Sequence, residues 1–177
     1  NEPLNTSTRG SRKEFPAVAV IAIVDFNQVR IYDGDDPSLP MWMIITNSVG
    51  GAGHTGNKTS VSAINGKIVF GIESQQGLRG LDFISDTIFA YKESVNAGAS
   101  GVSPNPIALR NESIDVSSWS KGYPGLVSAY INDVAMIVLP DAPIDPDTGL
   151  PIPTIAVATE GGVSVIKDDG TVVDIVA

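Results

Sequence analysis

Three short β-forming runs near the end of the chain, within residues 153–177, constrain its fold more than any other feature. β-Branched residues alternate with small residues in these runs, which is the pattern of a strand with at least one buried face. The runs are separated by Gly161-Gly162 and by Asp169-Gly170. Glycine in such pairs supplies the positive φ that tight hairpin turns require. The segment therefore predicts a three-stranded antiparallel meander, and it is the template for reading the rest of the chain.

Parts of this template recur earlier in the chain. Residues 68–73 (Ile-Val-Phe-Gly-Ile-Glu) match residues 155–160 (Ile-Ala-Val-Ala-Thr-Glu), and a more degenerate copy begins near residue 15. The triplet Val-Ser-Ala at residues 61–63 recurs at residues 127–129. Repeats of this type bury both faces of each sheet by stacking on their neighbours. The sequence therefore predicts an array of four-stranded meanders, each with an inner strand, two middle strands and an outer strand that carries Val-Ser-Ala.

These repeats, and the Gly-Gly-Val-Ser-Val-Ile run at residues 161–166, resemble the repeats of β-propeller proteins. We expect an all-β fold: a β-propeller-like array of antiparallel four-stranded meanders. The ring would be incomplete, with about two and a half to three blades, because propellers typically have roughly four to eight. Closing a ring would need a longer chain or associated copies, and an open sandwich is the alternative.

The expected division of the chain follows from these repeats. It comprises a polar tail, linker or borrowed edge strand at residues 1–14, a blade-like repeat at 15–64, a second blade-like repeat at 65–139 with a long loop at 94–125, and a Pro/Asp-rich connector with the start of a third repeat at 140–177.

Residues 140–175 also resemble segments of large repetitive proteins of marine bacteriophages, some of them assigned to the tail or virion. This resemblance implies a structural or host-contact role, and a location that is extracellular or on the virion surface. The chain begins with Asn instead of Met and its start lacks a signal-peptide pattern. We therefore expect a processed chain or a piece of a longer protein.

Composition excludes several classes of function. The 18 Gly and 12 Pro among 177 residues favour turns and short strands over long helices. A net charge of −9 disfavours a nucleic-acid partner, and the only local basic cluster is Arg9, Arg12 and Lys13. No apolar run reaches the roughly 18 residues that span a bilayer, so we expect no membrane insertion. The absence of Cys removes disulfides, thiol nucleophiles and Cys-based metal sites.

Two aromatic residues and the single histidine are the candidates for ligand binding. His54 lies in a glycine-rich loop at residues 47–58. The chain lacks a Gly-x-Ser-x-Gly elbow, so a catalytic triad around His54 is disfavoured and an exposed loop histidine is the alternative. Trp119 and Tyr123 lie in the irregular segment 94–125 and carry the type of ring on which sugars stack. We predict that Trp119, Tyr123 and His54 contribute to a ligand-binding surface.

A run of aspartates is the candidate for metal binding. Asp141, Asp145 and Asp147 bring acidic oxygens together in a turn, as a calcium loop requires. The run lacks the Asp-x-Asp-x-Asp-Gly spacing of an EF-hand loop, and aspartates in turns often bond their own backbone. Calcium at these three residues is the one cofactor that the sequence predicts.

The sequence supports two functional hypotheses. The first is a non-enzymatic structural or recognition module of a larger surface or virion (tail) protein, because internal repeats are present and catalytic motifs are missing. Its partners would be other chains or further repeats of the same protein, and a surface glycan or receptor. The alternative is a carbohydrate-active hydrolase or lyase using carboxylates on the propeller face, with Glu73, Asp82 and Glu160 near strand ends. In both cases the strand edge after Ile175 needs a covering segment.

Overall fold

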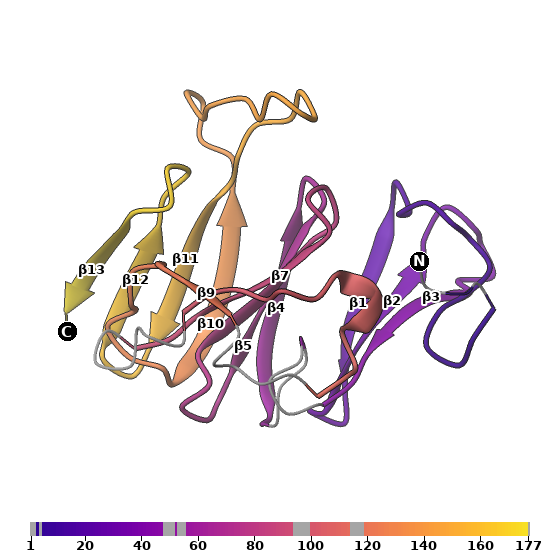
Figure 1. Ribbon diagram of the computed structural model, residues 1–177, viewed down its shortest axis with the longest axis horizontal. Coiled ribbons are helices and arrows are strands. Elements are labelled where there is room, and N and C mark those ends of the chain that lie inside the picture. The colour runs from indigo at the N-terminus through magenta and orange to yellow at the C-terminus, as the bar shows by residue number, and fades with distance from the viewer. Residues whose placement is uncertain are drawn as a thin grey trace.

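The computed structural model describes residues 3, 5–47, 52, 56–93, 100–113 and 119–176, without the side chains of Ser120 and Lys121. Regular structure in these ranges consists of three antiparallel β-sheets that follow one another along the chain, and one short 3-10 turn, η2 (Ile107–Leu109) (Figure 1). The all-β prediction is therefore confirmed. None of the helical structure in these ranges is long and apolar enough to cross a bilayer.

The first sheet contains β1 (Ala19–Val24), β2 (Gln28–Asp33) and β3 (Met41–Ile45), in the order β1-β2-β3. The N-terminal segment lies along the free edge of β3. The N–H of Ile44 donates to the carbonyl of Thr8 (2.9 Å), and the N–H of Gly10 donates to the carbonyl of Trp42 (2.9 Å). Residues 8–10 thus supply a short edge strand to this sheet.

Acidic side chains of the β2–β3 turn fix the path of the chain before β1. The guanidinium of Arg12 donates to the carboxylates of Asp33 (2.7 Å) and Asp35 (2.8 Å). Asp35 also accepts hydrogen bonds from the N–H groups of Ala17 (2.9 Å) and Val18 (3.0 Å). The hydrogen bond from Arg12 is the main reason that the pKa of Asp35 is lowered. These contacts hold the N-terminal segment against the first sheet.

The second sheet is the middle layer. Its strands are β4 (Lys58–Ile64), β5 (Lys67–Ile72), β6 (Leu78–Asp82), β7 (Thr87–Tyr91), β8 (Gly101–Val102) and β9 (Ser120–Lys121), paired in that order. In β5, Ile68 and Phe70 face the first sheet and Val69 faces the third, and all three are 0% exposed. β5 is therefore buried on both faces, which explains its nearly continuous apolar sequence.

The third sheet contains β10 (Ile131–Ile137), β11 (Thr154–Thr159), β12 (Gly162–Ile166) and β13 (Val172–Val176). Its last three strands confirm the meander predicted at residues 153–177. Gly162 has φ 129° and Gly170 has φ 79°, so both turns use the left-handed backbone that glycine allows. At Gly162 a Cβ would also clash with the carbonyl of Ile175 on the neighbouring strand.

The grouping of strands corrects one expectation. The Val-Ser-Ala strand was predicted to close the first sheet, but β4 opens the second sheet and pairs with β5. The reason is the hairpin turn at Asn65-Gly66, whose φ values of 50° and 74° connect β4 directly to β5. The second Val-Ser-Ala, at residues 127–129, comes before β10 instead of within it. The last strand of each predicted repeat therefore belongs to the following sheet.

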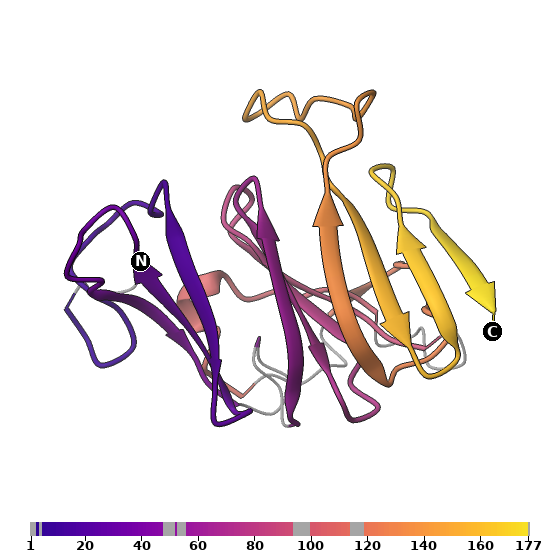
Figure 2. The same ribbon diagram turned by 180° about the vertical axis from the view of Figure 1, so that it is seen from behind.

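The first strands of the second and third sheets lie near a common edge of the stack. β4 lies beside both β1 and β10. The purple β4 and the orange β10 point in the same direction (Figure 2). The N–H of Lys58, at the start of β4, donates to the carbonyl of Phe26, just after β1 (2.9 Å). β4 therefore begins where β1 ends and runs in the opposite direction to β1.

Two hydrophobic cores hold the three sheets together. The first lies between the first and second sheets and includes Trp42 and Trp119, and the second lies between the second and third sheets. The sheets stack face to face as an open series of layers (Figure 1). Three classes of surface remain for function: the hollows between layers, the free edge of β1 and the outer face of the third sheet.

Candidate functional site

Trp119, which the sequence suggested as a stacking platform, lies inside the first core. It is 3% exposed, and the guanidinium carbon of Arg79 lies 4.9 Å from its ring centroid. Arg79 is itself 0% exposed, and its guanidinium nitrogens have no hydrogen-bond partner in the described part of the chain. Burial lowers the pKa of Arg79 to about 10. Trp119 therefore contacts an internal cation and turns no open face to solvent.

Tyr123 lies at a groove between the second and third sheets. Its ring stacks on that of Tyr91, with centroids 4.7 Å apart and planes at 25°. The groove has a volume of about 450 Å³, and Phe89, Ile155 and Lys167 also line it. Burial and then the nearby carboxylate of Asp82 raise the pKa of Tyr123, so its hydroxyl remains a hydrogen-bond donor at neutral pH. We call this site the inter-sheet groove.

Carboxylates in the inter-sheet groove allow a test of the hydrolase hypothesis. Asp82, Asp168 and Asp169 line the groove together with Tyr123. Burial by itself raises the pKa of Asp82, but its hydrogen bond with Lys67 (2.6 Å), the charge of Lys67 and two backbone N–H groups together lower it. A glycosidase acid needs a carboxyl group whose pKa is raised. Asp82 instead stays ionised as the partner of Lys67.

The second groove carboxylate also serves the local fold. Asp169 accepts hydrogen bonds from the hydroxyl (2.6 Å) and the N–H (2.9 Å) of Thr171, and these bonds lower its pKa. They close the turn between β12 and β13, as turn aspartates commonly do. Asp82 and Asp169 therefore support structure in the arrangement seen.

The aspartate run predicted to bind calcium forms a compact turn. The carboxylate of Asp145 accepts from the N–H of Asp147 (2.9 Å), and the carbonyl of Asp145 accepts from the N–H of Gly149 (2.8 Å). Asp141 lies in the same excursion between β10 and β11. Over the residues that the structure describes, no three His, Cys, Asp or Glu side chains gather as a metal-binding group. Calcium binding by this turn stays a prediction.

His54, the remaining predicted ligand-binding residue, lies outside the described residues. Its contribution to a binding surface stays a prediction.

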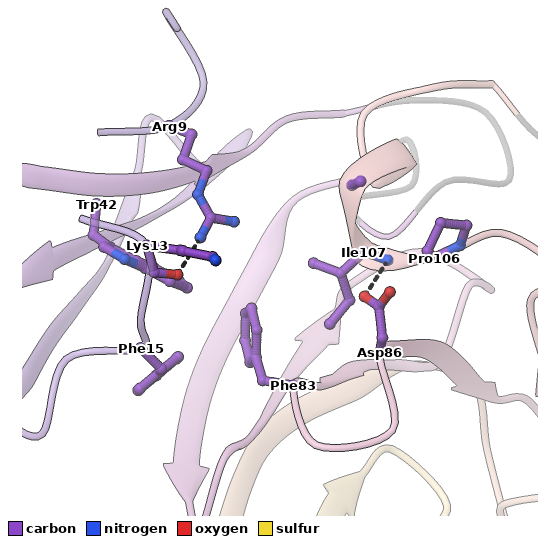
Figure 3. Close-up of a pocket in the computed structure, with 9 residues that line it drawn as sticks. Arg9, Lys13, Phe15, Trp42, Phe83, Asp86, Pro106 and Ile107 are labelled. Carbon is purple, nitrogen blue, oxygen red and sulfur yellow. Dashed lines mark hydrogen bonds between the residues drawn. The ribbon is translucent and has the colours of Figure 1, made fainter. Parts of the chain in front are cut away.

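A hollow that the sequence did not predict lies between the N-terminal segment and the second sheet (Figure 3). It has a volume of about 280 Å³. We call it the N-terminal hollow, and it is lined by Arg9, Lys13, Phe15, Trp42, Phe83, Asp86, Pro106, Ile107 and Ala108.

Three aromatic rings form one side of the N-terminal hollow. The centroid of Phe15 lies 5.0 Å from that of Trp42 and 4.9 Å from that of Phe83, and the Trp42 and Phe83 centroids are 5.5 Å apart. Edge-to-face and tilted contacts at these distances are favourable. Phe15 and Phe83 are only partly buried, so parts of both rings remain accessible. These contacts also fix the chain between residues 8–10 and β1.

Two cations face the same hollow. The guanidinium of Arg9 lies 4.9 Å from the Trp42 ring centroid and donates to the carbonyl of Lys13 (2.7 Å). In Figure 3 the nitrogen-bearing ends of Arg9 and Lys13 lie close together and point toward Phe83 and Ile107. Among the described residues Lys13 forms no ion pair. The Lys13 ammonium can donate hydrogen bonds to an anionic group bound here.

The opposite wall of the N-terminal hollow carries one acceptor. The carboxylate of Asp86 accepts a hydrogen bond from the N–H of Ile107 (3.1 Å), which ties the β6–β7 turn to η2. Its second oxygen is available to accept from a hydroxyl group. Cations, accessible aromatic rings and one acceptor are together the chemistry that recognises a ring-shaped ligand bearing a carboxylate.

The third sheet presents an aliphatic outer face. Alternate residues of its strands point away from the core, and two of the most exposed are Val173 (43%) and Ile175 (60%). We define the outer face of the third sheet by the side chains of Ala135, Ile137, Ala156, Ala158, Val163, Val165, Val173 and Ile175, and the register places the polar residues Asp133 and Thr154 on the same face. This largely aliphatic face is a candidate interaction surface.

Comparisons of the chain with protein-family models, with curated proteins and with solved structures found no match. The function is therefore inferred from the geometry of the chain itself.

Proposed function

We propose that the chain is a non-enzymatic structural and recognition module of a larger β-propeller-type protein on a cell or virion surface. The observation that carries the proposal is the exposed outer face of the third sheet. The second sheet has the same meander, and its corresponding face packs against the third sheet. A further sheet of the same type is the occupant that this geometry favours, because stacking would then continue with the same packing.

The hydrophobic free energy gained by burying this face can be estimated from its exposed side chains. Fully burying a Val or Ile side chain contributes about 1.5–3 kcal/mol, so half-exposed side chains such as Val173 and Ile175 would each contribute roughly 1 kcal/mol. Several such side chains lie on one flat surface, and the total therefore reaches several kcal/mol before the cost of association. This gain favours a stacked neighbour, and it acts against an association cost of about 4–15 kcal/mol.

The N-terminal hollow supports the recognition part of the proposal. The chain carries a net charge of −9, yet Arg9 and Lys13 lie together at this hollow. Such local positive charge attracts an anionic ligand despite the overall charge. An acidic glycan or a receptor with an exposed carboxylate fits this chemistry.

The stacking claim is tested by sedimentation velocity over a range of protein concentrations. In a solution of this chain, the sheet available for stacking is that of a second copy. We expect the wild type to self-associate and Ile175→Asp to remain monomeric, because a buried carboxylate on the interface is costly. Leu150→Asp is the matched control: Leu150 is 41% exposed but lies off the sheet, so this variant should associate like the wild type.

Circular dichroism should show the same β-sheet spectrum for all three proteins, which separates association from folding. A wild type that stays monomeric at the highest concentration would contradict the proposal. Equal association by the wild type and Ile175→Asp would also contradict it, because the contact would then lie elsewhere.

A further inference from the structure

The last strand of each predicted repeat belongs to the next sheet, so the first sheet lacks the leading strand that the other two sheets have. β4 ends the first predicted repeat (residues 15–64) and opens the second sheet, and β10 ends the second repeat (residues 65–139) and opens the third sheet. The first sheet begins directly with β1. β1 therefore corresponds to β5 and β11, the second strands of the other two sheets.

Contacts between the layers support this correspondence. β10 lies against both β4 and β5, the first two strands of the preceding sheet. β4 lies against β1 in the way that β10 lies against β5. Among the described residues, the first sheet has no strand that lies beside β4 in the way that β4 lies beside β10. The place for such a strand is the free edge of β1, since β1 pairs only with β2 there.

A hollow is present at this place. It has a volume of about 340 Å³ and lies between β1 and the end of β4. Ala19 and Ile21 of β1 line it with the preceding residues 15–17, and Ala63 and Ile64 of β4 line it with residues 65–67, which follow β4. Small and aliphatic side chains are the surroundings that a further β-strand of moderate side-chain size requires.

Burial differs between β1 and its counterparts. Ile68 of β5 and Val157 of β11 are 0% exposed. Ile21 of β1, which also points into a core, is only partly buried. The difference is explained if a neighbouring strand covers β5 and β11 but not β1.

We propose that the free edge of β1 binds an additional β-strand of the β4 type, the last strand of another repeat. The added strand runs antiparallel to β1, as β4 does to β5 and β10 does to β11. It fills the hollow beside β4 and gives the first sheet the same leading strand as the other two. Main-chain hydrogen bonds provide the affinity, and the small side chains of the Val-Ser-Ala sequence fit between Ala19 and Ala63.

This inference rests on the repeat array of the proposed function but uses a different surface. The edge of β1 and the outer face of the third sheet belong to opposite ends of the stack. Strand addition and sheet stacking can therefore be tested separately.

The probe is a synthetic peptide with the sequence of residues 57–65, which contains β4 and its flanking asparagines. Amide hydrogen exchange of the whole chain is followed by NMR with and without the peptide at millimolar concentration. We expect alternate amides of β1 to exchange at least about tenfold more slowly, because an added strand accepts their hydrogen bonds. Amides of β13 should not change.

The matched control is the same peptide with proline in place of Ser62. Proline cannot donate to a β-ladder, so this peptide should give no protection. The Ile175→Asp protein should respond to the unmodified peptide like the wild type, even if its self-association is lost. The inference is overturned if β1 amides are not protected, if the proline peptide protects them equally, or if protection appears on β13 instead.

Discussion

We expect the protein to become more stable between neutral and mildly alkaline pH because of Lys58, the first residue of β4. Lys58 is 1% exposed. Its ammonium group donates to the carbonyls of Asn27 (3.3 Å) and Gly56 (3.4 Å) and to the side-chain oxygen of Asn47. These three acceptors are neutral. Burial therefore lowers the pKa of Lys58 from 10.5 to about 8.

The direction of the effect follows from proton binding. Between about pH 8 and about pH 10.5 the unfolded state holds more protons on Lys58 than the folded state does, so the free energy of unfolding rises with pH in this window. The difference between the two pKa values corresponds to about 3 kcal/mol. About 2 kcal/mol of this is recovered between about pH 7 and about pH 9.5.

The substitution Lys58→Met isolates this contribution, because other titrating groups act equally on both proteins. Urea unfolding followed by tryptophan fluorescence gives the free energy of unfolding at each pH. We expect the wild type to gain about 2 kcal/mol relative to Lys58→Met over this pH range. Lys167→Met is the control, since Lys167 is exposed, and it should show no such gain. A relative gain below about 0.5 kcal/mol for Lys58 would refute the reasoning.

Three further predictions follow from particular contacts. The ring of Phe89 lies over Gly80, where a Cβ would come within 2.7 Å of a ring carbon. We therefore expect Gly80→Ala to lower the free energy of unfolding by about 2 kcal/mol in urea titrations. Adding Phe89→Leu to this variant should restore part of the lost stability. Arg79→Met should raise the free energy of unfolding by about 1 kcal/mol, because removing a desolvated charge (about 3 kcal/mol) outweighs the lost contact with Trp119 (about 2 kcal/mol); a loss of stability would contradict this. NMR titration should show glucuronate, but not glucose, binding at the N-terminal hollow, with about fivefold weaker affinity in Lys13→Gln; equal binding of both sugars would contradict this.

Local turn chemistry made much of the fold predictable. The meander at residues 153–177 was predicted correctly because Gly162 and Gly170 need left-handed backbone at positions that only a tight reversal provides. The grouping of strands was predicted less well. The Asn65-Gly66 turn that pairs β4 with β5 is visible in the sequence, but the recurrence of Val-Ser-Ala assigned β4 to the preceding repeat.

The sites were less predictable than the fold, because they depend on contacts between segments far apart in the sequence. The basic cluster around Arg9 was visible in the sequence, but its position over Trp42 results from pairing of the N-terminal segment with β3. Burial of Trp119 likewise depends on segments far from it in the sequence, among them Arg79 of β6. For the aspartate run, hydrogen bonding to the local backbone was the stated alternative to calcium binding, and the carboxylate of Asp145 makes such a bond.

Solvent accessibility of the methyl groups on the outer face of the third sheet tests the central claim most directly. A soluble paramagnetic agent broadens the methyl signals that water reaches, so the signals of Val163, Val165 and Ile175 can be compared with those of Leu150 at increasing protein concentration. The account predicts that the three face residues become protected as the concentration rises while Leu150 stays accessible. Equal accessibility of all four residues at every concentration would contradict the claim that this face is built to stack on another sheet.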